Sequence, residues 1–181
     1  MSADEAAELR ERAEKAREDK SLAGVSLTMA VVAVFVAVVS LLGHRAHTEE
    51  VVLQAKASDQ WAFYQAKSIR QHEDELFSDL TGVVASKDAA GMDKFREKAA
   101  QEADRYKHDK GEIKDEADKL VAEVAMETRR ADRYDLAEVF LEVGLVVTSI
   151  TLLSGRRIFW HVGIVLTVVG VAVAIMGAIV H

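Results

Sequence analysis

The sequence predicts an all-α membrane protein with three transmembrane helices and an antiparallel, coiled-coil-like helical hairpin between the first and second of them. Three long apolar runs predict the spans, because about 20 apolar residues of helix cross a hydrocarbon core about 30 Å thick. These runs cover residues 22–42, 136–153 and 158–180. The segment between the first two holds 16 Lys and Arg and 21 Asp and Glu, so apolar and charged residues are segregated along the chain.

The chain contains no proline in 181 residues, which favours long, uninterrupted helices, since proline breaks them. Residues 1–21 are predicted to form a charged helix that precedes the first span. This segment holds seven acidic and five basic residues, whereas a signal peptide starts with a short basic segment. We therefore expect residues 22–42 to be a retained anchor.

Residues 43–135 carry two apolar stripes at heptad spacing, which predicts two helices that pack along narrow seams. The first stripe consists of Ala55, Ala62, Ile69, Leu76 and Val83. The second consists of Met92, Ala99, Tyr106, Ile113 and Leu120, reinforced by Ala103, Ala117, Val124 and Ala131. The polar and glycine-containing stretch at residues 86–91 is the best turn signal between the stripes, so a hairpin is expected to reverse there.

The last two spans are joined by residues 154–157, a link short enough to force them to be antiparallel. Seven Lys and Arg flank the spans on the N-terminal side and five on the hairpin side. This excess favours an N-terminus in the cytoplasm and a hairpin in the periplasm, by the rule that positive charge stays inside. The expected location is the bacterial inner membrane.

Small residues recur at spacings of three and four along each span. On the third span they are Gly163, Thr167, Gly170, Ala174 and Gly177. Small residues let helices in lipid approach closely, and this packing drives their association. The stripe therefore predicts close helix packing, either within one chain or between subunits of a homo-oligomer.

Two carboxylates lie one turn apart early in the second span, at Glu138 and Glu142. Carboxylates inside a membrane are costly without a cation or water. His44 and Arg45 follow the first span at the same membrane face, so the four residues are predicted to form a polar cluster. Its role is either a structural ion pair or a proton or cation site.

Trp61, Phe63 and Tyr64 stand together in an otherwise charged segment. Because aromatic residues dominate the energetically important positions of protein interfaces, they form a candidate docking patch, with packing inside the hairpin as the alternative. The stretches His44–Glu49 and Asp59–Ile69, read as HRAHTE and DQWAFYQAKSI, resemble the bacterial family known as domain of unknown function 4337. The resemblance implies a small multi-span membrane protein and supplies no catalytic or ligand-binding residues.

No phosphate-binding glycine loop, nucleophile elbow or metalloprotease helix occurs in the sequence. The chain has no cysteine, and His44 with His47 supplies too few ligands for zinc, so no catalytic residue, cofactor or metal is expected. The net charge of −7 argues against a nucleic-acid partner.

We therefore expect a non-enzymatic, self-associating integral membrane protein that acts as a scaffold or docking subunit through its hairpin. Its expected partners are the lipid bilayer, further copies of itself and another membrane protein. The alternative is a small oligomeric channel or ion-translocating protein.

Overall fold

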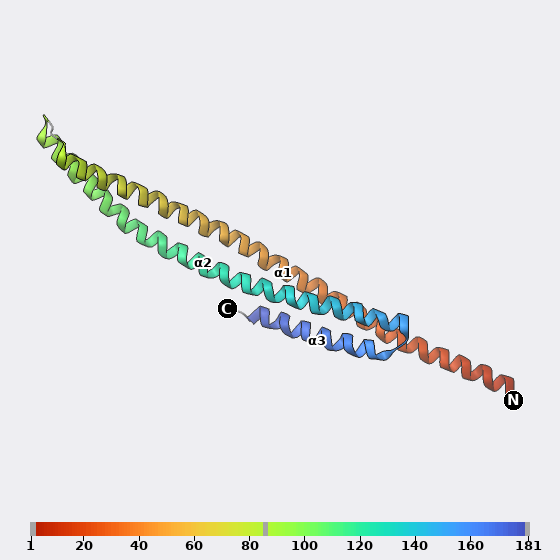
Figure 1. Ribbon diagram of the computed structural model, residues 1–181. Coiled ribbons are helices and arrows are strands. Elements are labelled where there is room, and N and C mark those ends of the chain that lie inside the picture. Colours follow the sequence, from red (N-terminus) through yellow and green to blue (C-terminus); the bar gives the residue numbers. More distant parts are fainter. Residues whose placement is uncertain (1–2, 85–86, 180–181) are drawn as a thin grey trace. The chain divides into compact units, whose positions relative to one another are not determined.

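Three α-helices make up the computed structural model, which describes residues 3–84 and 87–179, and side chains from Leu22 onward. Helix α1 covers Ala3–Val83, α2 covers Ala89–Ser154 and α3 covers Arg157–Ile179 (Figure 1). Within the described residues α-helix is the only regular secondary structure, which confirms the all-helical prediction. The first predicted span and the first arm of the predicted hairpin share the single helix α1, and the second arm and second span share α2.

An N-cap starts α2. The Gly91 amide donates to Asp88 Oδ1 at 2.9 Å, and the Met92 amide donates to the Asp88 carbonyl at 3.2 Å. Aspartate is favoured at this position because its carboxylate accepts from one of the amides that the first helical turn leaves unpaired. The predicted turn at residues 86–91 overlaps this helix start, although Ser86 lies outside the described residues.

A single glycine ends α2. Gly155 has a φ of 66°, a left-handed conformation that side chains with a Cβ rarely adopt, and its amide donates to the Thr151 carbonyl at 2.9 Å. The Arg156 amide donates to Ser154 Oγ at 3.3 Å. The chain can therefore reverse within two residues and start α3 at Arg157, one residue before the predicted span. The last residue of that predicted span, Val180, is outside the described part of the chain.

The chain divides into two compact units. The first comprises Met1–His47 and Glu127–His181 and is called the apolar unit; the second comprises Thr48–Met126 and is called the charged unit. Helices α1 and α2 contribute to both units. Each of the three helices contains a stretch long and apolar enough to cross a membrane, and all three stretches belong to the apolar unit.

All three helices contribute to the core of the apolar unit. Its buried members are Val39 and Ala46 of α1 and Ala131, Tyr134, Ala137 and Leu141 of α2, with Val171, Val173 and Ala174 of α3 packed against them. Large apolar side chains on the outward faces are exposed, among them Val34, Val146 and Val165. Such a surface suits lipid, because soluble monomers rarely expose extensive apolar patches.

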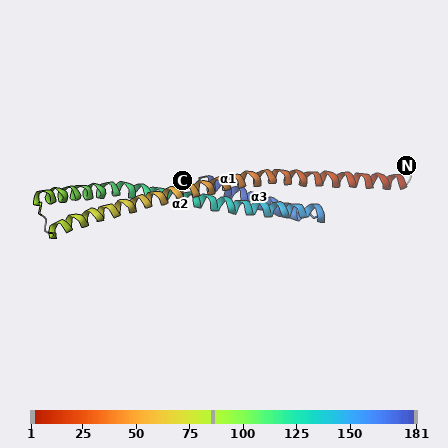
Figure 2. The ribbon, with the colours of Figure 1, turned by 90° about the horizontal axis from the view of Figure 1, so that it is seen from above.

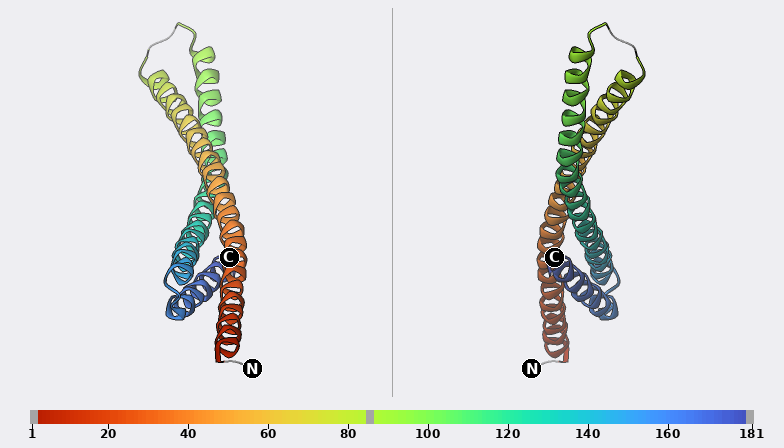
Figure 3. Two further views of the ribbon diagram at one scale, coloured as in Figure 1. Left: turned by 90° about the vertical axis from the view of Figure 1, so that its right-hand side faces the viewer. Right: turned by 90° about the vertical axis from the view of Figure 1, so that its left-hand side faces the viewer.

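In the charged unit, the contacts between α1 and α2 follow one another in reverse order along the two helices. Lys67 contacts Asp109, Phe77 stacks edge-on against Phe95, and Arg96 donates to Thr81 Oγ1 at 3.5 Å. Figures 2 and 3 show these segments of α1 and α2 running alongside each other. On α2 the predicted stripe is buried or half-buried, with Ala99, Ala103 and Ala117 buried and Met92, Tyr106, Ile113 and Leu120 half-buried.

On α1 the predicted stripe does not face α2, which corrects the sequence prediction for this helix. All five of its members, Ala55, Ala62, Ile69, Leu76 and Val83, are exposed. A different face of α1 is buried, at Leu53, Ala57 and Gln71. The physical reason is that this face has apolar residues of its own, Leu53 and Ala57, and also holds Lys67, which pairs with Asp109 of α2, whereas a heptad of apolar residues predicts burial without identifying the partner.

Candidate functional site

The best-defined polar cluster of the charged unit surrounds the aromatic residues that the sequence singles out. We call it the aromatic–lysine cluster; its members are Trp61, Phe63, Tyr64 and Lys67 of α1 and Tyr106, Asp109 and Lys110 of α2. The three α1 aromatics fall within four residues of the chain, so they share about one helical turn. The two lysines come from different helices and bring the aromatic rings of both helices into one arrangement.

Lys67 is the centre of this cluster. Its Nζ donates to Asp109 Oδ2 at 2.8 Å and lies 5.5 Å from the ring centroid of Phe63 and 5.0 Å from that of Tyr106. Its side chain is only 18% exposed. An ammonium group within about 6 Å of an aromatic face is attracted by the ring, and more strongly when it is partly removed from water. Lys67 therefore links two rings and one carboxylate across the two helices.

Lys110 makes a second link in the opposite direction. Its Nζ lies 5.3 Å from the ring centroid of Tyr64 and donates to Ser68 Oγ at 3.4 Å. Tyr64 in turn meets Trp61 edge-on, with centroids 5.6 Å apart and ring planes at 77°. This T-shaped arrangement is one of the favoured geometries for aromatic pairs.

The three residues of the predicted docking patch thus differ in accessibility. Trp61 and Tyr64 are half-buried, whereas the Phe63 side chain is 51% exposed. Because Lys67 lies over its ring, Phe63 has a supported position on the surface of the charged unit. An exposed aromatic ring on a rigid helix can bind an apolar or aromatic group of another protein.

The hydrogen bond from Lys67 holds the pKa of Asp109 below its ordinary value of 3.8, assisted by the charges of Lys67, Arg105 and His108. The stability that this pairing contributes is present above the ordinary pKa and is lost as the pH falls through the lowered one. In Lys67→Gln we expect the Asp109 pKa to rise towards 3.8, measured by carboxyl-carbon NMR during a pH titration of the full chain in micelles. Lys94→Gln, which changes an exposed lysine of the same unit, is the control; an unchanged Asp109 pKa in Lys67→Gln would contradict this assignment.

In the apolar unit, His47 pairs with Asp135, with Nε2 and Oδ2 3.1 Å apart. The sequence analysis missed this pair, although both residues lie just outside predicted spans. Glu138 is half-buried and Glu142 is exposed, and among the described contacts neither forms an ion pair with Arg45. The predicted polar cluster stays a prediction.

The packing of α1 against α2 explains which acid meets His47. A Cβ on Gly43 would lie 3.5 Å from both Asp135 and Tyr134, so position 43 of α1 is level with positions 134 and 135 of α2. Glu138 and Glu142 lie three and seven residues further along α2, towards the interior of the span, about 4.5 and 10 Å away at 1.5 Å per residue. The contact at Gly43 shows how far α1 and α2 are shifted along one another. The sequence does not reveal this shift.

The glycines of the predicted small-residue stripe all pack against α2 of the same chain. Gly163, Gly170 and Gly177 are buried. A Cβ added to them would meet Thr148 and Gly144, then Leu141 and Ala137, then Arg133 and Tyr134, respectively. Thr167 and Ala174, the other members, are half-buried. These glycines therefore pack α3 against α2 within one chain. Their contacts do not support a role in packing between subunits.

Among the described residues, each unit contains a hollow. In the apolar unit, a hollow of about 280 Å³ separates α1 from α3 and is lined by Leu27, Thr28, Val31, Val32, Ile164, Thr167 and Val168. Trp160 Nε1 donates to Thr28 Oγ1 at 3.3 Å beside it. Both threonine hydroxyls donate to carbonyls of their own helices, at Gly24 and Gly163, so the lining is apolar in character.

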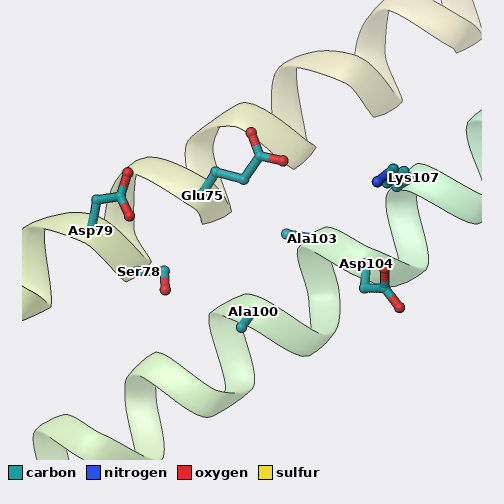
Figure 4. A pocket seen from close by; sticks show the side chains of 7 residues that line it. All are labelled: Glu75, Ser78, Asp79, Ala100, Ala103, Asp104 and Lys107. Atoms are coloured by element: carbon teal, nitrogen blue, oxygen red, sulfur yellow. The ribbon is translucent and has the colours of Figure 1, made fainter.

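In the charged unit, a hollow of about 370 Å³ lies between α1 and α2 (Figure 4). Its lining residues are Glu75, Ser78 and Asp79 of α1 and Ala100, Ala103, Asp104 and Lys107 of α2. The small side chains of Ser78, Ala100 and Ala103 leave this space open. Among the described residues, no three His, Asp or Glu side chains converge as a metal-binding group.

Comparison with known proteins adds one finding. The family described as domain of unknown function (DUF4337) matches residues 21–180, which includes all three apolar runs and the charged unit. No curated protein and no solved structure matches the chain.

Proposed function

Since the chain belongs to the DUF4337 family, whose description assigns no activity, we propose a function from its physical features. The protein is a non-enzymatic, self-associating integral membrane protein. It acts as a scaffold or docking subunit, with its charged unit as a two-helix arm that binds another membrane protein. The observation that carries this proposal is Phe63, an exposed ring whose centroid lies 5.5 Å from the Lys67 ammonium, which supports it in place.

The different compositions of the two units support the proposal. The apolar unit has the length and composition of a membrane anchor, while the charged unit gathers four of its aromatic residues, Trp61, Phe63, Tyr64 and Tyr106, in one cluster. The rest of the charged unit is rich in Lys, Arg, Asp and Glu, which are suited to contact with water. We propose further that the anchor lies in a bacterial inner membrane with the N-terminus in the cytoplasm, supported by the excess of basic residues on that side.

A photo-crosslinking side chain placed at Phe63 in the full chain tests the docking role in native membranes. We expect a discrete adduct with one membrane protein, and we expect Phe63→Ala to remove that protein from the affinity-purified complex. Val121, an exposed apolar residue of the same unit with a similar exposed fraction, is the matched control. Equal adducts at both positions would show only non-specific apolar contact and would contradict the proposal.

One observation favours the channel alternative: Glu142 is exposed within an apolar span, where a lipid-facing carboxylate is costly. A water-filled path between subunits would hydrate it. The hydroxyls of Thr28, Thr148 and Thr167 give no such support, because each donates to a carbonyl of its own helix. Ion flux in proteoliposomes that is lost in Glu142→Gln would establish the channel in place of the scaffold.

A further inference from the structure

The hollow between α1 and α3 has the character of a binding site for a hydrocarbon chain. Its volume is about 280 Å³, and none of the described residues that line it is charged. Val32 is buried within it, whereas Leu27, Val31 and Val168 are exposed, so the hollow opens to the outside of the apolar unit. Its lining belongs to helices with stretches long and apolar enough to cross a membrane, so the medium at the opening is lipid.

The two polar side chains of the lining already have hydrogen-bond partners inside the protein. Thr28 Oγ1 donates to the Gly24 carbonyl at 2.9 Å and accepts from Trp160 Nε1 at 3.3 Å. Thr167 Oγ1 donates to the Gly163 carbonyl at 2.8 Å. Because ordered water in a cavity needs two to four polar partners, water is poorly suited to this space. A second helix is too large for it, since one turn about 10 Å across and 5.4 Å long fills roughly 400 Å³.

Two arginines precede the hollow along the chain. Arg156 and Arg157 are both exposed, and α3 begins at Arg157. Residues 143–179 contain no Asp or Glu, and residues 17–20 of α1 hold two acidic and two basic residues, which cancel. The arginines therefore give this end of the spans a positive charge that attracts anionic lipid. A guanidinium group can also bind two phosphate oxygens at once.

The distance from the arginines to the far side of the hollow matches one leaflet of a bilayer. The hydrogen bond between Trp160 and Thr28 places the indole ring at the level of Thr28 on α1. Along α3, Arg157 lies about 4.5 Å before Trp160 at 1.5 Å per residue. Ile164 and Val168 lie about 6 and 12 Å beyond Trp160. A chain that passes from Arg157 to Val168 thus extends over about 16.5 Å, close to half of a hydrocarbon core about 30 Å thick.

We propose that the apolar unit binds one anionic phospholipid, with its phosphate on Arg156 and Arg157 and one acyl chain in the hollow between α1 and α3. This proposal rests on the membrane anchor of the proposed function and does not depend on the docking arm. Tryptophan is enriched at the headgroup level of bilayers because its ring is apolar and its N–H is polar. Here Thr28 accepts from that N–H, so the ring of Trp160 is held against α1 beside the hollow.

Fluorescence of Trp160 reports on this site directly. The chain has two tryptophans, so Trp61→Phe leaves Trp160 as the only one. The full chain is placed in phosphatidylcholine vesicles that contain a variable fraction of one lipid with brominated acyl chains, which quench tryptophan. We expect half-maximal quenching at a roughly tenfold lower fraction of brominated phosphatidylglycerol than of brominated phosphatidylcholine, because each basic residue near a headgroup contributes about 1 kcal/mol.

Removing the two charges is expected to abolish most of this preference. The variant is Arg156→Gln with Arg157→Gln in the Trp61→Phe background. Arg45→Gln with Arg129→Gln is the matched control, because it removes two exposed arginines of the same unit that lie on α1 and α2 instead of beside the hollow. An equal loss of preference in both double variants would show only general attraction between charges and would overturn the proposal.

Filling the hollow tests the acyl-chain half of the site. Val31→Phe places a ring in it and is expected to weaken quenching by brominated phosphatidylglycerol, whereas Val34→Phe is expected to leave it unchanged. Val34 is an exposed valine of the same helix that does not line the hollow. Equal quenching in the two variants would overturn the proposal, and so would a preference that millimolar inorganic phosphate removes, since that result indicates a simple anion site.

A wash of the vesicles in alkaline carbonate separates this proposal from the proposed function. Protein that the wash removes would contradict the membrane anchor and the lipid site together. Protein that stays in the vesicles and is quenched equally by the two brominated lipids would contradict the lipid site alone.

Discussion

Replacing Gly163 with alanine is expected to disrupt the contact between α2 and α3 and to destabilise the protein by about 2 kcal/mol. The new Cβ would overlap Thr148 Oγ1 and would lie 2.8 Å from the Gly144 carbonyl oxygen. Neither group can move freely, since Thr148 is fully buried with its hydroxyl donating to that same carbonyl at 2.8 Å. Helices α2 and α3 must therefore move apart at Gly163. The contacts between them at Gly170 and Gly177 are weakened as a result.

Thermal unfolding in detergent, followed by the loss of monodisperse protein in size-exclusion chromatography, measures this effect. Gly24→Ala is the control, because a Cβ there meets nothing within 4 Å and alanine is the better helix former. We expect the melting temperature to fall in Gly163→Ala and to stay constant or rise in Gly24→Ala. Equal melting temperatures would mean that α2 and α3 do not pack through Gly163.

Leu141→Ala is expected to cost about 2–4 kcal/mol, because it leaves a cavity in the core of the apolar unit. Leu141 is fully buried and belongs to the cluster of Tyr134 and Ala137, and its Cγ lies in the space beside Gly170. The same thermal measurement applies, with Leu153→Ala as the control on the same helix, since that leucine is 88% exposed. A Leu153 variant that loses as much stability as the Leu141 variant would contradict this description of the core.

The sequence was sufficient to predict the helices and the stretches that are long and apolar enough to cross a membrane, because both depend on composition over long windows. It also identified the inward face of α2, where alanines at Ala99, Ala103 and Ala117 repeat among charged residues. The face of α1 was predicted wrongly, since an apolar heptad is equally suited to contacts within a chain and between chains. The buried face of α1 instead holds Leu53 and Ala57, together with Lys67, which pairs with Asp109 of α2.

Side-chain pairings were harder to predict for a related reason. The pair of His47 with Asp135 depends on how far two helices are shifted along one another, and no local pattern encodes that shift. Likewise, a stripe of glycines predicts close approach of a helix without specifying which one. The contacts of Gly170 with Leu141 and Ala137 identify α2 as that helix only once the structure is known.

The two-residue link at Gly155 has a consequence for the order in which the apolar unit is assembled. Gly144 and Gly163 are 19 residues apart in the chain, whereas Trp160 and Thr28, which join α3 to α1, are 132 residues apart. Contacts between residues that are close in sequence require less loop closure and form earlier. Helices α2 and α3 are thus expected to pair during biosynthesis before α1 docks, so the last-made third of the chain would template the placement of its first span.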